Sequence, residues 1–466
     1  MTTQQDETAN SYSTFLQSKR LQSQSAGFSV ELDAIHPRLF DFQRVLVQWE
    51  LRKGRAALFA ECGLGKSFMQ LEWARLVYAH TGSDVLILAP LAVASQTIAE
   101  GQKLDIVVHP CRSQADVRPG LNIANYEMLA HFDTSHFTGI VLDESSILKS
   151  YMGKTKRALV DAFARTPYRL CCTATPAPND VMEIGNHSEF LGIMPSPEML
   201  MRWFINDTMS NGHYRLKGHA AKDFWQWVAS WAISLRRPSD LGYSDDGFSL
   251  PELQMTRHYV ETDVTIGVED GQLFRAPTMS ATNLHKEMRL TAADRAQAVA
   301  DLVNGSEETW VIWCNTNYEQ EELEKHFGDR AFSVYGSLSS VEKERRVLGW
   351  LHGERSILIS KPSICGYGLN FQHCHKTAFV GLSYSFEDFY QAVRRLYRFG
   401  QQYPVDVVIV AAETESPLVV TLERKMRAHM QMSESMVMDS VSLQEDLQLT
   451  IYNPQIPMIV PTWLVA

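Results

Sequence analysis

The sequence lacks several features that would assign it to a class at once. It contains no run of about 18 uninterrupted apolar residues, which argues against a membrane span. Its N-terminus has no apolar segment of the kind that a secretory signal needs. The seven cysteines are scattered and form no CxxC pair, so the pattern does not indicate a disulfide framework. These absences predict a cytoplasmic protein that does not contact a membrane.

A net positive charge is also missing. The 466 residues include 43 Lys and Arg and 54 Asp and Glu, for a formal net charge of −11. Residues 1–240 hold 24 basic and 24 acidic side chains, so all the excess acid lies in the remainder. This balance excludes a diffuse polycationic surface for nucleic acid, but it leaves room for a local phosphate-binding groove.

Short apolar runs alternate with helical patterns in two successive series. Such alternation is typical of an α/β fold, in which helices cover both faces of a parallel sheet. The candidate strands of the first series are residues 56–60, 84–90, 121–125, 139–144 and 168–175. Those of the second series are residues 309–315, 331–336, 356–362, 376–383 and 405–412.

The two series predict two lobes. We expect a polar tail at 1–25, a first lobe at 26–255 that includes a helical segment at 185–255, a second lobe at 256–425 and an extension at 426–466. Aromatic residues between 200 and 232 could stack on bases, but core packing is the simpler interpretation. The extension begins with a Met-rich helix, which we expect to pack against the second lobe because methionine fills irregular apolar gaps.

The stretch "FAECGLGKSFMQ", residues 59–70, follows an apolar run and precedes a helical pattern. That context is typical of a phosphate-binding loop, whose glycines turn backbone N–H groups toward the phosphates at a helix start. Lys66 would bridge the β- and γ-phosphates, and Ser67 would hold Mg²⁺. The alternative is a tight turn that carries a lysine, since Ala60 stands where the common pattern begins with glycine. The residues of the loop are Gly63, Leu64, Gly65, Lys66 and Ser67.

A second candidate strand ends in carboxylates, in "GIVLDESS". Asp143 would hold Mg²⁺ through water, and Glu144 would polarise the attacking water. The alternative interpretation is a strand that ends in acidic residues at a helix N-terminus, where the helix dipole favours them.

Taken in order, "GLGKS", "LDESS", "TATP" and "QAVRRLYRFGQ" resemble motifs I, II, III and VI of superfamily 2 helicases. The resemblance covers about residues 36–412 and is strongest to the Snf-type translocases and to compact phage-type relatives of them. It implies two RecA-like parallel-sheet lobes with an ATP cleft between them, and ATP and Mg²⁺ as cofactors. Motif II reads DESS where other branches read DEAH or DEAD.

The resemblance also implies roles for individual residues. Gln43 in "FDFQ" would read the adenine base, and Gly368 in "GYGLNFQ" would lie near the nucleotide. Thr173 and Thr175 in "TATP" would couple hydrolysis to lobe movement. In motif VI the residues that would face ATP are Gln391, Arg395 and Arg398. The residues expected to contact nucleic acid are Pro90, Asn125, Thr175 and Asn370.

The chemistry of phosphoryl transfer favours the arginines independently. Charge builds on the equatorial oxygens, and an arginine from a second lobe can neutralise it. Arg395 and Arg398 are three positions apart, so they would share one face if the segment is helical. Arg394 would point elsewhere and be structural or bind phosphate. An arginine cluster by itself is more often a solvated face.

The sequence therefore predicts an ATP hydrolase that translocates along or remodels nucleic acid, with double-stranded DNA as the partner. One alternative is a strand-separating helicase on RNA or DNA, and another is a scaffold or sensor switched by ATP. The basic segment 149–157 could contact phosphates or form a solvated loop. Protein partners in a replication, repair or defence complex are also expected.

Overall fold

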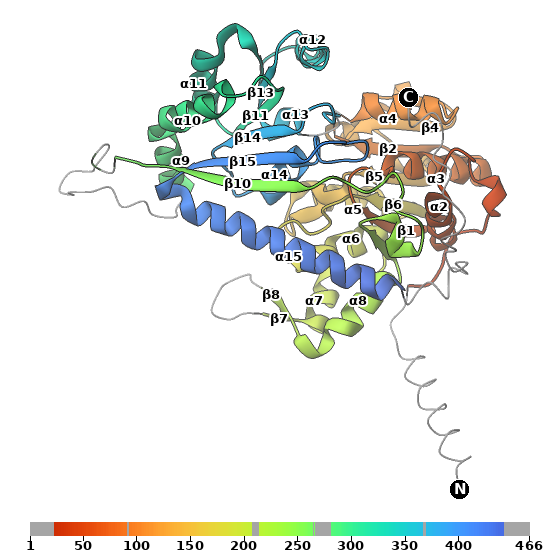
Figure 1. Ribbon diagram of the computed structural model, residues 1–466. Helices are drawn as coiled ribbons and strands as arrows, with labels where there is room; N and C mark the ends of the chain where they lie inside the picture. Colours follow the sequence, from red (N-terminus) through yellow and green to blue (C-terminus); the bar gives the residue numbers. More distant parts are fainter. Residues whose placement is uncertain are drawn as a thin grey trace. The chain divides into compact units, whose positions relative to one another are not determined.

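The computed structural model describes residues 23–90, 93–206, 214–263, 265, 281–366 and 370–441 (Figure 1). The chain divides into two compact units. The first comprises Met1–Ala89, Thr97–Asp245 and Met430–Ala466, and the second comprises Pro90–Gln96 and Asp246–His429. Most of the predicted polar tail and the end of the predicted extension lie outside the described residues.

The first unit is built on a parallel sheet with the strand order β3-β4-β2-β5-β6-β1-β9. Its central strands are continuous apolar runs because helices cover both of their faces. All five predicted strands of this series are present, but β3 and β9 were not predicted, since each is too short to show a periodic pattern. The strands are β1 (Arg55–Ala60), β2 (Val85–Ala89), β3 (Val108–Pro110), β4 (Leu121–Asn125), β5 (Gly139–Asp143), β6 (Tyr168–Cys172) and β9 (Ala232–Leu235).

The segment predicted as helical, residues 185–255, is mixed. It contains helices, the strand β9 and an antiparallel hairpin formed by β7 (Phe204–Asn206) and β8 (Tyr214–Leu216). Its tryptophans are buried in the core of the first unit, which confirms the core interpretation: Trp203, Trp225, Trp227 and Trp231. The helices of this half of the chain are α2 (Asp41–Lys53), α3 (Lys66–Thr81), α4 (Ala94–Lys103), α5 (Lys154–Ala162), α6 (Ile184–Leu191), α7 (Ser196–Trp203) and α8 (Ala221–Ala229).

The second unit is built on another parallel sheet, with the order β10-β15-β14-β11-β13-β12. Alternate residues of β11 enter two different core clusters, because successive side chains of a strand point to opposite faces. The two sheets confirm the predicted fold class of two RecA-like parallel-sheet lobes. The strands are β10 (Leu253–Val260), β11 (Trp310–Cys314), β12 (Ala331–Val334), β13 (Ile357–Ser360), β14 (Lys376–Val380) and β15 (Val405–Ala412).

Strand β10 was not predicted, and the lobe boundary expected at residue 255 falls inside it. The strand pairs with β15 along its whole length, so it belongs to the sheet of the second unit. Leu253, Met255 and Val260 are half-buried and its other residues are exposed, so the strand lacks the apolar run that marks the inner strands.

The remaining helices are α9 (Ala281–Leu290), α10 (Ala292–Asn304), α11 (Asn317–Phe327), α12 (Ser340–Leu351), α13 (Pro362–Cys365), α14 (Phe386–Val393) and α15 (Ser416–Val441). Leu418 and Leu422 of α15 are buried in a core cluster of the second unit. Met432 and Met436 are instead buried in the core of the first unit, so the expectation that the Met-rich helix packs on the second lobe is wrong for these two side chains. Within the part of the chain that the structure describes, no helix is both long and apolar enough to cross a membrane.

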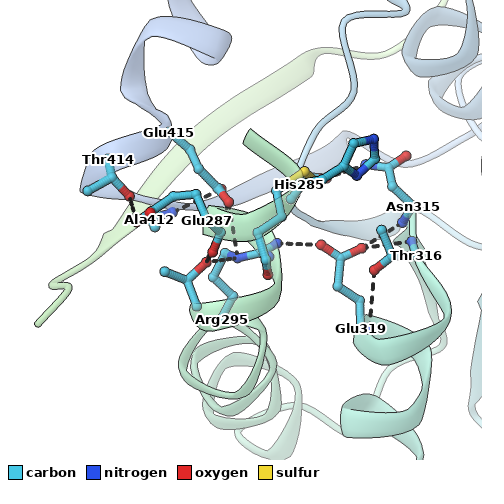
Figure 2. A network of polar contacts seen from close by, with 12 residues as sticks. His285, Glu287, Arg295, Asn315, Thr316, Glu319, Ala412, Thr414 and Glu415 are labelled. Carbon is cyan, nitrogen blue, oxygen red and sulfur yellow. Dashed lines mark hydrogen bonds and ion pairs between the residues drawn. The ribbon is translucent and has the colours of Figure 1, made fainter. Parts of the chain in front are cut away.

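A buried ion network holds the second unit together at one end of β11 and β15 (Figure 2). Arg295 of α10 is fully buried, and its Nη1 atom donates to Glu319 Oε1 at 2.8 Å. Its Nε atom lies 3.6 Å from Glu415 Oε1. The other oxygen of Glu319 accepts from the backbone N–H groups of Asn315 and Thr316, at 2.8 and 3.0 Å. One guanidinium therefore connects three elements that are far apart in the sequence.

Replacing Arg295 with alanine should destabilise the second unit by about 3–5 kcal/mol, because two buried carboxylates would lose their cation. Burial already raises the pKa of Glu415, and Arg295 opposes that rise. The measurement is urea denaturation of the full chain, followed by circular dichroism. The matched control is Arg345→Ala, which breaks a 2.8 Å ion pair with Glu342 where the arginine is 58% exposed, and this should cost less than about 1 kcal/mol. Equal losses in the two variants would contradict the interpretation.

Candidate active site

The glycine-rich loop joins the end of β1 to the start of α3. Gly63 and Gly65 have φ angles of 93° and 78°, a backbone region that strongly favours glycine. A Cβ atom on Gly65 would also collide with the side chain of Gln43. The loop can therefore follow this path only because glycines stand at these two positions, as the predicted phosphate cradle requires.

Lys66 is the first residue of α3, and its side chain turns back over the loop. Its Nζ atom donates to Ala60 O at 2.8 Å and to Glu61 O at 3.4 Å. The start of this 16-residue helix adds the positive end of the helix dipole. The ammonium and the helix start together supply positive charge that suits a polyphosphate.

Gln43 of α2 is bound to the same loop. Its Nε2 atom donates to Leu64 O at 2.9 Å, and its Oε1 atom accepts from Phe40 N at 2.9 Å. The side chain is only 3% exposed. Gln43 therefore positions the loop, and reading of the adenine base by Gln43 stays a prediction.

The predicted carboxylates lie at the same edge of the sheet, because β5, β6 and β1 are neighbours and parallel. Burial raises the pKa of Asp143 to about 7, and the Glu144 carboxylate adds to that rise. Lys66 opposes it, as does Gln70, which lies one turn along α3. Lys66 and Asp143 thus belong to one electrostatic environment at this edge of the sheet.

Glu144 has an unusual backbone conformation, with φ 54° and ψ 57°. Left-handed geometry is uncommon for a residue other than glycine, and it concentrates at functional sites. The Glu144 Oε2 atom accepts a hydrogen bond from Thr173 Oγ1 at 3.3 Å. Thr175 is fully buried, and its N–H donates to the same Thr173 oxygen at 3.1 Å. Both threonines of "TATP" thus lie with the carboxylates, and Thr175 does not lie on the surface.

The residues present fit a divalent cation. The Oδ2 atom of Asp143 is buried, and no hydrogen-bond donor reaches it from the described residues. Two adjacent carboxyl groups with a raised pKa at one of them indicate a place where positive charge is needed. Ser67 follows Lys66 at the start of α3 and supplies the hydroxyl that the magnesium prediction requires.

Other residues expected to contact nucleic acid are found at strand ends or in loops. Pro90 directly follows β2, and Asn125 is the last residue of β4. Asn370 is exposed, and its Oδ1 atom accepts from Gln372 N at 3.2 Å. Gly368 lies outside the described residues. Tyr126 was missed, although its hydroxyl donates to the Asp143 carbonyl at 2.8 Å, because no sequence spacing links the two residues.

One lysine of the basic segment 149–157, Lys156, does not fit the prediction that this segment contacts phosphates. Lys156 is buried, and its ammonium lies 2.6 Å from Glu189 Oε2. The same ammonium donates to Ser196 Oγ at 3.4 Å. Lys156 therefore joins α5 to α6 and is not available to a phosphate group.

In the second unit, the predicted arginines lie just beyond a helix and not within it. Helix α14 ends at Val393, so the common helical face expected for Arg395 and Arg398 does not form. Arg395 is 7% exposed, and its Nη2 atom donates to Gln391 Oε1 at 2.9 Å. Arg394 lies over the rings of two tyrosines, which agrees with the structural role considered for it: Tyr390 and Tyr397.

The turn that carries these arginines is hydrogen-bonded to the end of the segment "GYGLNFQ", residues 366–372. The N–H of Phe371 donates to the carbonyl of Arg395 at 3.0 Å. The buried amide of Gln401 donates to the carbonyls of Gln372 and Cys374, both at 3.0 Å, and to Leu396 O at 3.2 Å. Gln401 therefore holds the two motifs together, which the motif sequence alone does not reveal.

A pocket lined by both polar and apolar side chains opens at the carboxyl ends of β11, β13 and β14. This edge of a parallel sheet is where ligands commonly bind. The Lys361 ammonium donates to Asn317 Oδ1 at 2.6 Å, beside the start of α11. The lining residues are His285, Met288, Asn315, Thr316, Lys361, Pro362, Ser363, Leu382, Ser383, Tyr384 and Asp388.

The chain shows similarities to a known family, to a phage protein and to a solved structure. Residues 294–400 match the family described as the helicase conserved C-terminal domain. The protein is also 20% identical to putative protein p41 of Acyrthosiphon pisum secondary endosymbiont phage 1, over 83% of this chain and 96% of that protein. A solved structure, the Sulfolobus solfataricus SWI2/SNF2 ATPase core in complex with dsDNA, aligns with a TM-score of 0.42 at 16% identity, over 90% of this chain and 98% of that one.

The matched residues 294–400 include Gln391, Arg395 and Arg398. The second unit therefore contains a segment that matches the helicase conserved C-terminal domain, in agreement with the predicted resemblance to superfamily 2 helicases.

Proposed function

We propose that the protein is an ATP-hydrolysing motor of the Snf type, which uses ATP to translocate along or remodel double-stranded DNA. The observation that carries the proposal is the convergence of Lys66, Asp143, Glu144 and Thr173 at neighbouring strand ends of the first unit. A phosphate cradle without the carboxylates would support binding alone. The carboxylate pair adds the means to activate water.

Each residue then has a chemical task. Lys66 and the N–H groups of residues 63–67 hold the phosphates, and Glu144 accepts a proton from the attacking water. Mg²⁺, held by Ser67 and through water by Asp143, would neutralise phosphate charge when bound. For Gln391, Arg395 and Arg398 of the second unit, contact with ATP stays a prediction from the resemblance.

We expect nucleic acid to contact the loops at the strand ends. Pro90 and Asn125 of "APLAVASQTIAE" and "IANYEML" would contact the backbone of the bound strand, as would Asn370. The pocket around Asn315 and Lys361 supplies further hydroxyl, amide and ammonium donors, which suit phosphate oxygens. The excess acid elsewhere in the second half of the chain confines such contacts to local sites.

The first test compares ATP turnover with double-stranded DNA, single-stranded DNA, RNA and no nucleic acid. We expect the largest stimulation with double-stranded DNA and little dependence on its sequence. Stimulation should fall steeply between about 50 and 200 mM salt, because phosphate contacts release counterions. A preference for RNA would favour the strand-separating helicase, and turnover indifferent to every nucleic acid would favour an ATP-switched scaffold.

Replacing Lys66 with alanine should abolish ATP hydrolysis and leave the fold intact. Its ammonium donates to carbonyl oxygens of its own loop, so stability should change by less than about 1 kcal/mol. Binding of a fluorescent ATP analogue, turnover and melting temperature are measured together. The exposed Lys154 supplies the control variant, Lys154→Ala, which should retain turnover. Normal turnover in Lys66→Ala would refute the phosphate cradle.

Replacing Arg398 with alanine should lower turnover by about 10³-fold or more, as expected for an arginine that stabilises the transition state. ATP binding should fall far less, since the contact is strongest in the transition state. Arg398→Lys should not restore turnover, because a point charge cannot reproduce the planar guanidinium. Arg394→Ala is the control, since Arg394 lies against two tyrosine rings, and it should be milder. Equal effects at both positions would overturn the assignment.

A further inference from the structure

The segment that follows Glu144 is held by a helix that no catalytic motif contains. This segment is the 3₁₀ helix Ser145–Lys149, and Glu144 is its N-cap residue. Helix α6 places two adjacent, fully buried side chains against it, Asn186 and His187. The Nε2 atom of His187 lies 3.1 Å from Ser145 Oγ, which is also fully buried. Asn186 Nδ2 donates to the carbonyls of Leu148 at 2.9 Å and Lys149 at 3.2 Å. The segment is thus bound to α6 at both of its ends.

These contacts matter because Glu144 lies between fixed neighbours in a strained conformation. A left-handed residue other than glycine persists only where its surroundings determine it. On one side, the hydroxyl of Tyr126 binds the carbonyl of Asp143 at 2.8 Å. On the other side, Ser145 is bound to His187. The Glu144 carboxylate is then directed by Thr173 at 3.3 Å.

We propose that Asn186 and His187 of α6 form a clamp that positions Glu144 for water activation, an inference that rests on the proposed ATPase function. His187 is the critical member, because it is bound to the residue next to Glu144. The ring also packs edge-on against Phe59 of β1, with the ring centroids 5.2 Å apart, so its position is set from two elements. His187 is a positioning residue, since it acts on the reaction only through Ser145 and Glu144.

His187 and Ser145 can keep their hydrogen bond at physiological pH. Burial lowers the pKa of His187 to about 4, so its imidazole is neutral at physiological pH and can share a hydrogen bond with a hydroxyl group. The serine at position 145 matters as well, because alanine, which stands there in a DEAH or DEAD motif, could not make this bond. Helix α6 is also the first α-helix after the "TATP" segment. A movement of Thr173 and Thr175 could therefore displace Asn186 and His187 through the short stretch of chain between them.

The experiment compares His187→Phe, which keeps a ring but loses the hydrogen bond, with His187→Gln, whose amide can reach Ser145. Misplacing a catalytic group by about 1 Å can cost about 10²-fold in rate, so kcat of His187→Phe should fall about 10- to 100-fold. KM for ATP should stay within about twofold of that of the unmodified protein, because the phosphate cradle is unchanged. His187→Gln should recover most of the lost kcat, which a purely structural loss would not explain.

Ser145→Ala is a second test variant, because it removes only the hydroxyl that binds His187. It still tests the proposal if His187→Phe does not fold. The double variant should be no slower than either single variant, since both remove the same bond. Ser188→Ala is the matched control: Ser188 is a buried residue of α6 whose Oγ atom donates to Met194 O at 2.9 Å, away from Glu144. It should lower the melting temperature and leave kcat unchanged.

Amide hydrogen exchange of residues 145–149 supplies a readout that does not need turnover. Exchange there should accelerate in His187→Phe and not in Ser188→Ala. If the unmodified protein hydrolyses ATP and His187→Phe matches its kcat, or if exchange at 145–149 is unchanged, the clamp is overturned and the proposed function stands. If the unmodified protein hydrolyses no ATP with any nucleic acid, the proposed function fails and the catalytic role of the clamp fails with it.

Discussion

Two adjacent carboxyl groups, Asp143 and Glu144, at the buried end of β5 are the constraint on which the rest of the first unit depends. Placing them there is unfavourable, as the raised pKa of Asp143 indicates, and a fold retains such a pair where a cation or a reaction needs it. Lys66 on the next helix and the threonine hydroxyl at the end of β6 are the polar groups that face them. The parallel order β5-β6-β1 brings all of these to one edge of the sheet.

The second unit also contains buried charged side chains, but there they form a structural network. Arg295 is surrounded by carboxylates as completely buried as itself, and the network ends in backbone N–H groups at the start of α11. These buried charges fix the positions of other residues and take no part in the proposed chemistry. Glu319 holds Asn315 and Thr316, which line the pocket (Figure 2). The pocket is therefore built on a rigid base, as a site for a polar ligand needs to be.

The predicted catalytic residues are also held in place by other polar side chains, some from within the quoted motifs and one, His187, from outside them. Gln43 binds the loop around Gly65, and Gln401 joins the turn after α14 to Gln372. Tyr126 binds the Asp143 carbonyl and His187 binds the Ser145 hydroxyl, on either side of Glu144. The contacts of Gln43, Tyr126 and His187 are buried, where a hydrogen bond that loses its partner is costly. The site is thus a set of catalytic groups inside a larger set of polar contacts that determine their geometry.

Sequence patterns were sufficient for the inner strands and for the phosphate loop. Continuous apolar runs identify strands that are covered on both faces, and glycines at 63 and 65 are needed by local backbone geometry that no distant residue alters. The edge strands β3 and β9 were missed because each is too short to show a periodic pattern, and β10 was missed because it lacks an apolar run. The Met-rich helix was assigned to the second lobe alone. Composition indicates that its apolar side chains are buried, but it does not indicate which core they enter.

The sequence by itself determined the order of the chemical groups: a loop that can cradle phosphate, two carboxylates after a strand, and arginines in a later segment. Only the tertiary structure decided which groups meet. It ended α14 before Arg395, buried Lys156 against Glu189, and brought His187 to the serine beside Glu144. The reason is physical: local propensity acts between neighbours in the chain, whereas a buried polar contact is set by packing between elements that may lie more than a hundred residues apart.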